Sequence, residues 1–590
     1  MSQELGSIKR THLCGKLNKA NIGETIVLMG WVHRRRDLGG LIFIELRDRS
    51  GIVQVVFNPE TNGNTFQLAN KLRSEYVVAV RGTVEARPEE NINPDFSTGE
   101  IEVYGLDIMI LDSAKTTPFQ IKDETDVSEE IRLKYRYLDL RRPKMQAIMG
   151  LRHKVTKITR DYLDEMGFWE IETPILTRST PEGARDYLVP SRVNTGSFYA
   201  LPQSPQIYKQ LLMVAGIEKY FQIARCFRDE DLRANRQPEF TQIDIEMSFI
   251  TREGLFQMVD GLMRRLFALI DVELPAEIPL MTYAEAMDRF GSDKPDLRFG
   301  LELKDISAAV KESEFKVFSG TIADGGQVKG INFKGGADTP RRTIDGYVEY
   351  VKEFGAKGLA WMTLKDGEVK SQIAKFLTDE EIEDIIKLME GEEGDLLLFV
   401  ADKPAIVADA LGNLRLKIAR EAGLIPKDTY KFLWVVDFPM FEYDEEEGRF
   451  VSVHHPFTAP LDEDVDLLET APEKMRSKAY DLVLNGEELG GGSIRINNRD
   501  LQEKIFTALG IGAEEAKEKF GFMLEAFEYG TPPHGGIAFG LDRLIMILSG
   551  SNSIRDVIAF PKTQKATSLL DNAPSPVSEK QLKELGIRLI

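Results

Sequence analysis

The sequence predicts a multidomain α+β protein with a small N-terminal β-barrel, a larger domain built on an antiparallel sheet, and an α+β domain inserted into the larger one. Three observations lead to this prediction. The chain has 590 residues, which is too long for one hydrophobic core. Residues 13–111 consist of short alternating strands. Farther along, strands and helices mix in the manner of an antiparallel α+β domain. This pattern is interrupted by residues 295–426, which have a different pattern of helices and Gly-rich strands.

The N-terminal barrel is predicted from the order of its strands. Five alternating segments with one helical stretch after the third are typical of an OB barrel, a fold that commonly binds single-stranded nucleic acid. A local basic cluster, His33-Arg34-Arg35-Arg36, follows the first segment. The strands are expected at residues 25–32, 41–46, 52–57, 76–85 and 100–111, and the helix at 66–72.

Changes in composition predict the domain boundaries. Helical periodicity runs from residue 130 to 166 and is interrupted at Arg141-Arg142-Pro143. The inserted segment should contain helices at 305–314, 339–354 and 378–389 and a strand at 396–401. It has no clustered acid, base or metal-ligand set, which predicts a role in docking or stability. We expect an OB-fold domain at 1–112, a hinge at 113–138, the first part of the larger domain at 139–294, the insertion at 295–426, and the second part with a C-terminal extension at 427–590.

Composition argues against several classes of protein. An apolar content of 42% with 29% charged residues is that of an ordinary globular chain. No apolar run reaches the roughly 18 residues of a membrane span, and the first residues are too polar for a secretory signal, so we expect a cytoplasmic protein without a membrane partner. Cys14 and Cys226 form neither a metal-ligand spacing nor a disulfide framework. The net charge of −20 requires any nucleic-acid binding to use local basic residues.

Two sequence features indicate nucleotide chemistry. Alternating runs at 220–227 and 240–249 predict an antiparallel hairpin, and Arg228 leaves the first strand where its planar fork suits an α-phosphate or a carboxylate equally well. Three hundred residues later, Gly535, Gly536 and Gly540 allow a backbone to approach a ligand before an apolar helix whose first turn carries Arg543. Taken singly, the first is also compatible with a solvated hairpin tip and the second with a tight turn.

The two features together resemble motifs 2 and 3 of class II aminoacyl-tRNA synthetases. The segment Gly167-Phe-Trp-Glu-Ile-Glu-Thr-Pro174 resembles motif 1, and the barrel is similar to that of the aspartate, asparagine and lysine subgroup. The insertion, the segment 236–244 and Gly490-Gly-Gly-Ser-Ile-Arg495-Ile resemble bacterial-type aspartyl-tRNA synthetases over essentially the whole chain. This resemblance implies that ATP activates L-aspartate to aspartyl-adenylate, which then esterifies the 3′ end of tRNA(Asp).

The resemblance also implies an aspartate site. A buried carboxylate must meet a cation, since leaving it unpaired costs several kcal/mol, and Arg495 is the expected partner with Lys209 beside it. His454, and less surely His455, would close over the substrate, although each could instead be an ordinary loop histidine. Asp244 could alternatively be a strand residue paired with a neighbouring arginine. The implied aspartate-binding set is Glu182, Ser204, Gln206, Lys209, Arg228, Asp244, His454 and Arg495.

For ATP, the resemblance implies that Phe240 stacks under the adenine with Arg543 on its other side. Mg²⁺ prefers hard oxygen ligands, and Asp481 and Glu488 would supply them, unless they belong to a solvated acidic loop. No general base is required, because the carboxylate attacks the α-phosphorus in line while Arg228 and magnesium neutralise the charge of the transition state. Arg228 and Arg543 are the implied catalytic residues. The implied ATP-binding set is Arg228, Asp229, Glu230, Gln237, Phe240, Glu488, Gly540, Leu541, Asp542 and Arg543.

In the barrel, the resemblance implies anticodon contacts from Phe43, Gln54 and Arg36, the last within the basic loop. Phe43 alone could equally be barrel core. Motif 1 predicts a homodimer through the apolar residues Phe168, Trp169, Ile171 and Ile175.

Two questions about activity stay open. At position 38 this chain has Leu, which resembles enzymes that charge only tRNA(Asp). Relaxed enzymes, which also charge tRNA(Asn), often have His at that position. A noncatalytic tRNA-binding paralogue is the other alternative, but such proteins typically lose the nucleotide arginines. Both Arg228 and Arg543 are present.

Overall fold

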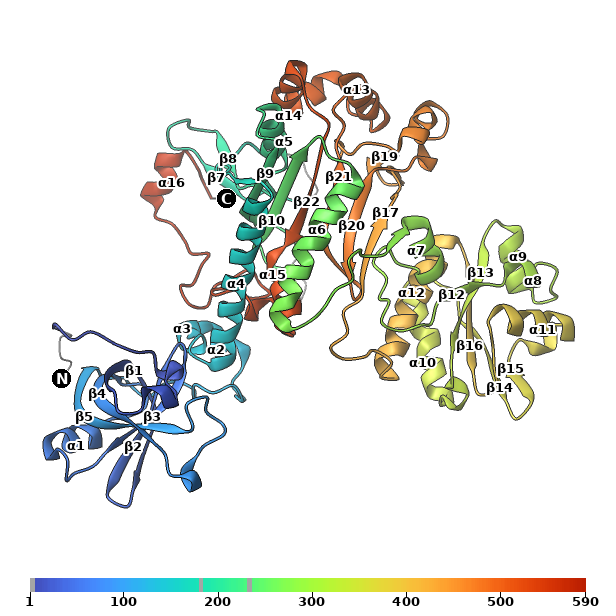
Figure 1. Ribbon diagram of the computed structural model, residues 1–590. Coiled ribbons are helices and arrows are strands. Elements are labelled where there is room, and N and C mark those ends of the chain that lie inside the picture. Colours follow the sequence, from blue (N-terminus) through green and yellow to red (C-terminus); the bar gives the residue numbers. More distant parts are fainter. Residues whose placement is uncertain (1–5, 180–183, 231–235, 590) are drawn as a thin grey trace. The chain divides into compact units, whose positions relative to one another are not determined.

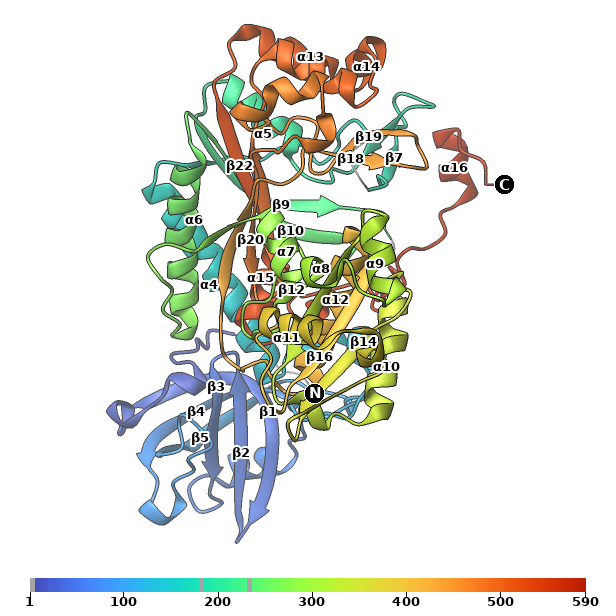
Figure 2. The ribbon, with the colours of Figure 1, turned by 90° about the vertical axis from the view of Figure 1, so that its right-hand side faces the viewer.

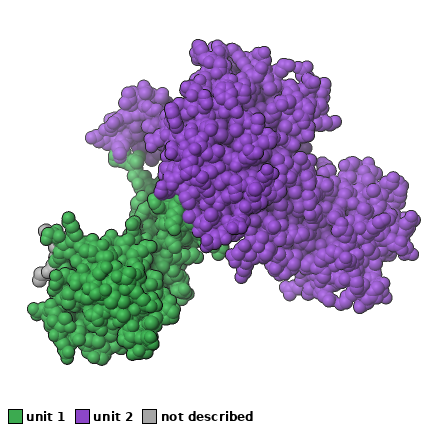
Figure 3. Space-filling model, viewed as in Figure 1, with its two compact units in different colours: residues 1–154, 232–237, 545–578 green, residues 155–231, 238–544, 579–590 purple. Residues whose placement is uncertain are grey.

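The computed structural model describes residues 6–179, 184–230 and 236–589. It divides into two compact units, which are described separately (Figure 3). The first unit consists of residues 1–154, 232–237 and 545–578, and the second of residues 155–231, 238–544 and 579–590. No helix of the described residues is long and apolar enough to cross a membrane.

The first unit contains the predicted closed barrel (Figure 1). Its strands follow the order β1-β2-β3-β5-β4, and β4 pairs back to β1. Alternate residues such as Ile42, Ile44 and Leu46 point into the core, as the period of two in a strand requires. The elements are β1 Thr25–Leu38, β2 Leu41–Asp48, β3 Gly51–Phe57, α1 Gly63–Asn70, β4 Val77–Ala86 and β5 Ile101–Asp112.

The first strand is longer than predicted, and this corrects the position of the basic cluster. We expected the strand to end at residue 32 and Arg36 to lie in a loop, but β1 continues to Leu38 and Arg36 pairs with Phe43 of β2. The pairing register shifts between Val32 and Arg34. Because the added stretch is almost entirely polar, it lacks the apolar alternation on which a sequence-based prediction depends.

Three helices follow the barrel, at α2 Glu129–Lys134, α3 Arg136–Asp139 and α4 Pro143–Glu165. Their bounds match the predicted periodicity and its interruption before Pro143. Arg136 is buried and donates hydrogen bonds to the carbonyls of Ala559 (2.9 Å), Arg555 (2.8 Å) and Ile558 (2.8 Å). Within the first unit, this side chain therefore helps to hold residues 555–559 in place.

The second unit is built on an eight-stranded sheet of order β11-β17-β20-β21-β22-β10-β9-β6. It is antiparallel except at its two edge pairs, and it includes the predicted hairpin as β9 and β10. The bounds are β6 Trp169–Glu170, β9 Lys219–Phe227, β10 Glu239–Ser248, β11 Leu280–Thr282, β17 Phe432–Val436, β20 Ala479–Leu484, β21 Glu487–Ile494 and β22 His534–Gly540.

Helix α6 (Arg252–Phe267) covers one face of this sheet (Figure 2). Its Phe256 stacks on Trp434 of β17, with 4.3 Å between ring centroids, and meets Tyr480 of β20 edge-on. The remaining elements are β7 Leu188–Pro190, β8 Phe198–Ala200, α5 Gln206–Val214, α7 Tyr283–Phe290, β18 Phe441–Asp444, β19 Arg449–Ser452, α13 Arg499–Ala508, α14 Ala513–Ala526, α15 Leu541–Leu548 and α16 Glu579–Leu585.

Between α7 and β17 lies a second sheet of order β12-β13-β16-β14-β15. Successive residues of β16 feed two cores, one against α10 and α12 and the other on the opposite side, with α8, α9 and α11 (Figure 1). The elements are β12 Leu303–Asp305, α8 Ser307–Val310, α9 Lys316–Ala323, β13 Gln327–Phe333, α10 Arg341–Lys352, β14 Ala360–Lys365, β15 Glu368–Ser371, α11 Asp379–Leu388, β16 Leu396–Asp402 and α12 Pro404–Glu421.

The predicted helix at 305–314 is wrong in extent, because only residues 307–310 are helical. The following turn is held by Ser313, whose hydroxyl accepts from the Phe315 amide (3.1 Å). Helix α12 was not predicted, although Val407, Leu411, Leu414 and Ile418 recur at helical spacing and pack into one core. Arg415 of α12 donates to the carbonyls of Asp296 (3.1 Å) and Gly300 (3.0 Å), which ties the small sheet domain to its entry segment.

Candidate active site

A pocket of about 690 Å³ opens on the large sheet and collects most of the predicted substrate residues. Its walls come from β10, β20 and β21, the first turns of α5, and the loop that follows β19. The predicted residues that line it are Ser204, Gln206, Lys209, Arg228, Asp244, His454, Asp481, Glu488 and Arg495. A neighbouring opening of about 770 Å³ shares Ser204, Gln206, Arg228, His454 and His455 and adds Glu230.

Strand register brings the charged residues of this pocket together. Asp244 and Glu246 are two residues apart on β10, so their side chains share a face. Glu246 pairs with Gly536 of β22, and Gly536 pairs with Ser493 of β21. A Cβ at Gly536 would lie 2.1 Å from the Glu246 carboxylate. Glycine at this position therefore makes room for a buried glutamate between two strands.

The floor of the pocket is a cluster of two cations and two carboxylates. Lys209 Nζ lies 2.7 Å from Asp244 Oδ1 and 3.2 Å from Glu246 Oε2. Arg495 Nε lies 3.0 Å from Glu246 Oε1. No side chain of the four is more than 5% exposed. The charges balance internally, which is the condition under which buried ions are tolerated.

This arrangement sets the protonation of the two carboxyl groups. Burial alone would raise the pKa of Glu246, but the adjacent Arg495 and Lys209 outweigh it and lower the pKa to about 2. For Asp244, burial prevails over the attraction of Lys209 and raises the pKa. Glu246 is thus the permanent anion of the cluster and holds Arg495 in place.

Glu246 is the functional residue that sequence reasoning missed. The alternation of Gln242, Asp244 and Glu246 already placed it on the polar face of the strand. What the sequence could not show is its partner, because Arg495 lies 249 residues away in the chain. Arg495 also donates to the Ser493 hydroxyl (2.7 Å), so its guanidinium is oriented from two sides.

Three buried polar atoms in this pocket have no hydrogen-bond partner in the described part of the chain. They are Gln206 Nε2, Arg228 Nε and Asp244 Oδ2. The nearby Tyr220 hydroxyl donates to Gln222 Oε1 (2.9 Å). A buried polar atom without a partner costs about 1 to 3 kcal/mol. Two hydrogen-bond donors and one acceptor without partners line the same cavity. They indicate a ligand that carries both acceptor and donor groups.

The arginine of each nucleotide motif has a defined position. The Arg228 guanidinium lies over the Phe240 ring, 5.1 Å from its centroid. Arg543, in the first turn of α15, donates to the backbone carbonyl of Glu488. Next to it, the Asp542 carboxylate accepts from the Thr241 amide (2.8 Å), which joins the start of α15 to β10.

The two predicted metal ligands also converge. Asp481 of β20 pairs with Gly491 of β21, and a register shift between Leu482 and Val483 turns Glu488 toward the same side. A Cβ at Gly491 would lie 2.4 Å from Asp481 Oδ1 and 3.5 Å from Glu488 Oε1. Burial and the Asp481 charge raise the pKa of Glu488. His454 Nε2 lies 3.8 Å from Asp481 Oδ1.

No described part of the chain gathers three or more metal-ligating side chains. Among the described residues, Asp481 and Glu488 are the two carboxylates that border the space left by the missing Gly491 side chain. This matches Mg²⁺, which usually takes one or two carboxylates and completes its octahedron with waters and substrate phosphates.

Several predicted residues lie elsewhere or make other contacts. Gly540 pairs with Gln242 in the sheet, and Leu541 is buried in the core. The Asp229 amide donates to the Arg185 carbonyl (3.0 Å). Glu182 lies outside the described residues. Gln237 belongs to the first unit, where its side-chain amide accepts from Lys562 N (2.8 Å) and donates to Lys562 O (3.0 Å).

The predicted anticodon residues share the outer face of the barrel. Because Ile42 and Ile44 point into the core, Phe43 between them points outward, and it is half-buried. Arg36 donates to Gln54 Oε1 (3.1 Å), and Gln54 donates to Glu102 (2.8 Å). The barrel-core alternative for Phe43 does not hold in this structure.

Comparisons with known proteins agree with this geometry. Residues 128–564 match the model of the family "tRNA synthetases class II (D, K and N)", and residues 26–111 match "OB-fold nucleic acid binding domain". The chain is 70% identical to the aspartate–tRNA(Asp/Asn) ligase of Halothermothrix orenii, with 100% of both chains covered. It is 59% identical to the aspartate–tRNA ligase of Geobacillus kaustophilus, with 99% of both covered.

A solved structure shares the fold. The asparaginyl-tRNA synthetase from Pyrococcus horikoshii, complexed with asparaginyl-adenylate, aligns with a TM-score of 0.59 at 20% identity, covering 94% of this chain and 98% of that one. With the family model spanning most of the chain and relatives this similar over its full length, the protein belongs to the class II tRNA synthetases of the aspartate, lysine and asparagine group.

Proposed function

We propose that this protein is an aspartate–tRNA ligase that forms aspartyl-adenylate from L-aspartate and ATP and transfers the aspartyl group to tRNA(Asp). The observation that carries the proposal is the buried cluster of Lys209, Asp244, Glu246 and Arg495 beside three unmet polar atoms. The pocket has two fixed cations at its base, and two hydrogen-bond donors and one acceptor without partners beside them. These groups are complementary to a small zwitterion that carries a second carboxylate.

Each group of aspartate has a matching partner in the proposed site. Arg495 and Lys209 are the cations for the side-chain carboxylate, and their positions are fixed in advance by Glu246 and Asp244. Asp244 Oδ2 is the open acceptor for the α-ammonium. The amide of asparagine carries no charge and would leave the two cations without a new partner, so the pocket should discriminate against it.

The chemistry follows from positioning. An α-carboxylate oxygen attacks the α-phosphorus of ATP in line, the new P–O bond forms, and the bond to the bridging oxygen of pyrophosphate breaks. Arg228 has an open Nε toward the pocket and is the proposed donor to the α-phosphate or the attacking carboxylate. A ribose hydroxyl at the tRNA 3′ end then attacks the anhydride carbon and releases AMP.

Asp481 and Glu488 are the proposed holders of Mg²⁺. The ion would neutralise charge on the phosphates, and its charge would relieve the repulsion between the two carboxylates. Removing divalent cations should therefore abolish adenylate formation and leave the fold intact.

We also propose a homodimer. β6 is an edge strand of the large sheet, and the exposed apolar side chains Trp169, Ile175 and Leu176 lie on it or just after it. Phe168, which the sequence analysis assigned to the interface, is buried within this chain and is not available for contact. Light scattering of the wild type and of Trp169→Asp should give a dimer and a monomer, respectively; a monomeric wild type at micromolar concentration would contradict the proposal.

A second candidate function is relaxed specificity, in which the enzyme also aspartylates tRNA(Asn). It is favoured by three relatives of 60–70% identity, whose names include both tRNAs. Leu38, exposed at the end of β1, favours the discriminating alternative. Since charged tRNA is consumed by ribosomes, either activity implies a cytoplasmic enzyme.

The test is aminoacylation with radiolabelled aspartate and purified tRNA(Asp), tRNA(Asn) and tRNA(Lys). Charging of tRNA(Asp) supports the main proposal, and equal charging of tRNA(Asn) adds the second candidate. Failure to charge tRNA(Asp) with an ATP-activated amino acid would contradict both.

A further inference from the structure

Two segments of chain, which we call the stems, join the inserted domain to the large sheet. The entry stem, residues 291–302, runs from the end of α7 to β12, and the exit stem, residues 422–431, runs from the end of α12 to β17. The sequence analysis expected the insertion to serve docking or stability. Both stems, however, contact the hairpin of β20 and β21, which carries the proposed metal ligands Asp481 and Glu488.

The turn of this hairpin is as short as a hairpin turn can be. Asn485 and Gly486 alone connect β20 to β21, and their φ angles are +55° and +85°. Two-residue turns with both residues in the left-handed region favour Asn-Gly. The turn therefore forms from its own sequence, and its contacts with the stems decide where it is held.

The exit stem binds the turn through Asn485. The side-chain Nδ2 of Asn485 donates to the Thr429 carbonyl (2.8 Å), and its Oδ1 accepts from the Lys431 amide (2.9 Å). The Asn485 amide also donates to the Lys431 carbonyl (3.2 Å). One residue of the turn is thus fixed by three hydrogen bonds to the end of the exit stem, which continues directly into β17.

The entry stem packs against the other residue of the turn. A Cβ at Gly486 would lie 3.1 Å from the Cβ of Asp296, so the bare backbone of the turn lies directly on this stem. Asp296 is buried, and its carboxylate accepts from the Arg298 amide (3.0 Å) and from the Arg298 guanidinium (2.6 Å). The stem is therefore rigidly bonded at the point where it meets the turn.

Arg415 of α12 ties the entry stem to the inserted domain. Its guanidinium is buried and lies over the rings of Phe290 and Phe299, 5.0 and 4.4 Å from their centroids. It donates to the carbonyls of Asp296 (3.1 Å) and Gly300 (3.0 Å). Because a planar guanidinium reaches several acceptors at once, this single side chain sets the path of the entry stem.

The entry stem also passes directly against α12. A Cβ at Gly291, where φ is +64°, would lie 2.3 Å from the Ala408 carbonyl oxygen, and a Cβ at Gly412 would lie 2.5 Å from the Gly291 carbonyl oxygen. Figure 1 shows α7, which precedes this stem, beside α12, which precedes the other. The two stems and α12 therefore form one continuous support for the turn.

The ladder of the hairpin is interrupted between the turn and the rest of the sheet. Glu488 pairs with Val483 on the turn side of the register shift, whereas Asp481 pairs with Gly491 on the other side. A β-bulge disrupts the ladder locally and bends the strand. The separation of the two carboxylates therefore depends on how the turn is held as well as on the ladder.

We infer that the inserted domain positions the metal-binding pair, because its two stems hold the Asn485–Gly486 turn and thereby keep Glu488 opposite Asp481. Asn485 and Arg415 are then positioning residues that act through the turn. The inference deepens the proposed function and rests on it, since it takes the two carboxylates as the ligands of Mg²⁺. It also gives the insertion a part in adenylate formation.

The exit stem is tested with Asn485→Gly in the full-length protein. Glycine adopts positive φ without strain, so the turn keeps its backbone and loses the two side-chain hydrogen bonds to the stem. Asp366→Gly is the matched control. Asp366 has φ of +59° in the two-residue turn between β14 and β15, is exposed, and makes no side-chain hydrogen bond to another described residue.

The first measurement is hydrogen–deuterium exchange of β20 and β21 without metal or substrate. Protection of the amides next to the turn should fall about ten-fold in Asn485→Gly, because two hydrogen bonds that hold the turn are lost. Protection in Asp366→Gly should equal that of the wild type. Unaltered protection in Asn485→Gly would overturn the inference.

The second measurement is aspartate-dependent pyrophosphate exchange titrated with Mg²⁺. The half-saturating Mg²⁺ concentration should rise about ten-fold in Asn485→Gly, with an unchanged KM for aspartate and with kcat recovered at high Mg²⁺. Asp366→Gly should titrate as the wild type does. Equal Mg²⁺ dependence of the two variants would overturn the inference, as would a fall in kcat at every Mg²⁺ concentration together with a raised KM for aspartate.

The entry stem is tested with Arg415→Lys, which keeps the charge but replaces the planar fork with a single ammonium. Arg420→Lys, at an exposed position of the same helix, is its control. The first should raise the half-saturating Mg²⁺ concentration and the second should not, and equal behaviour would contradict the role of the entry stem. If Arg415→Lys does not fold, the result for Asn485→Gly decides.

Failure of the proposed function gives a different result. Absent aspartate-dependent exchange in the wild type would overturn the proposed function itself. The protection measurement needs neither metal nor substrate, so it still decides whether the stems hold the turn. Wild-type exchange, with Asn485→Gly and Arg415→Lys behaving as their controls do, would overturn the inference alone.

Discussion

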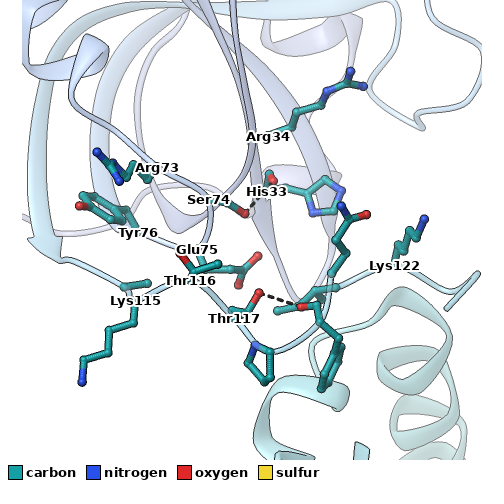
Figure 4. A pocket seen from close by; sticks show the side chains of 15 residues that line it. His33, Arg34, Arg73, Ser74, Glu75, Tyr76, Lys115, Thr116, Thr117 and Lys122 are labelled. Carbon is teal, nitrogen blue, oxygen red and sulfur yellow. Dashed lines mark hydrogen bonds between the residues drawn. The ribbon is translucent and has the colours of Figure 1, made fainter. Parts of the chain in front are cut away.

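The substrate pocket of the large sheet and a second pocket, lined by residues 33–34, 73–76 and 114–122 of the first unit (Figure 4), both present cations, but they present them in opposite ways. Lys209 and Arg495 are buried, and each meets a carboxylate of the chain itself. Arg73 and Lys115 are exposed and have no such partner among the described residues. Buried charges must be compensated before the ligand arrives, which fixes their positions and permits selection of a small molecule. Exposed charges need no partner before a polyanion binds, and their contribution to its affinity depends on salt concentration.

The largest effect is expected from Arg495→Leu. Removal of the guanidinium takes away the main partner of the aspartate side chain and should lower aspartate-dependent pyrophosphate exchange on the order of a thousand-fold, with ATP binding retained. Near-normal exchange at ordinary aspartate concentrations would remove Arg495 from the pocket.

That variant also leaves Glu246 with Lys209 as its only remaining cation among the described residues. The double variant Arg495→Leu/Glu246→Gln should recover thermal stability without recovering exchange. Such a result would separate the loss of the substrate partner from the cost of an undercompensated buried carboxylate.

A smaller effect, about a hundred-fold in exchange, is expected for Gly491→Ala. The added Cβ would lie 2.4 Å from Asp481 Oδ1, so the carboxylate must move away from the position opposite Glu488. The matched control is Gly320→Ala, where the new Cβ meets nothing within 4 Å. Higher Mg²⁺ should partly restore the first variant. If both variants behave alike, the space at Gly491 has no role in binding the cation.

In the barrel, Phe43→Ala should raise the Michaelis constant for tRNA about 5- to 150-fold, which corresponds to about 1 to 3 kcal/mol for one stacked base. It should act mainly on tRNAs with the cognate anticodon. Adenylate formation is measured in parallel, and its impairment in a well-folded variant would contradict separate roles for the barrel and the sheet pocket.

The smallest effect concerns stability at low pH. The pKa of Glu246 is about 2 in the folded protein against an ordinary value of 4.5. Its contribution is therefore present above pH 4.5 and is lost as the pH falls toward 2. The raised pKa of Asp244 opposes part of this change. Melting temperatures of Glu246→Gln should decline less steeply than those of the wild type over this range, and parallel curves would contradict the assignment.

Local sequence patterns predicted those helices and strands whose own residues show the periodicity of the element. Strand alternation indicated the barrel and the β9–β10 hairpin, and Pro143 marked the start of α4. The patterns failed where the determining contact is distant. The polar end of β1 is a strand because β2 pairs with it. Helix α12 differs, because its apolar residues do recur at helical spacing and it could have been predicted.

The site shows the same division. The family resemblance implied Arg228, Asp244 and Arg495 as site residues, and the structure gathers them in one pocket. The sequence could not reveal that Glu246 holds Arg495, because the two residues come together only through the order of strands in the sheet. The position of Glu488 likewise depends on a β-bulge in β21, which the residue pattern does not predict.

In this structure two buried cations, Lys209 and Arg495, are each balanced by a carboxylate of the chain, and we expect them to select a small dicarboxylic amino acid. The most direct test is ATP–pyrophosphate exchange by the wild-type protein with aspartate and with asparagine as the only amino acid. We expect exchange with aspartate to exceed that with asparagine by at least about a hundred-fold in kcat/KM. Comparable exchange with asparagine, or exchange with neither, would contradict the claim.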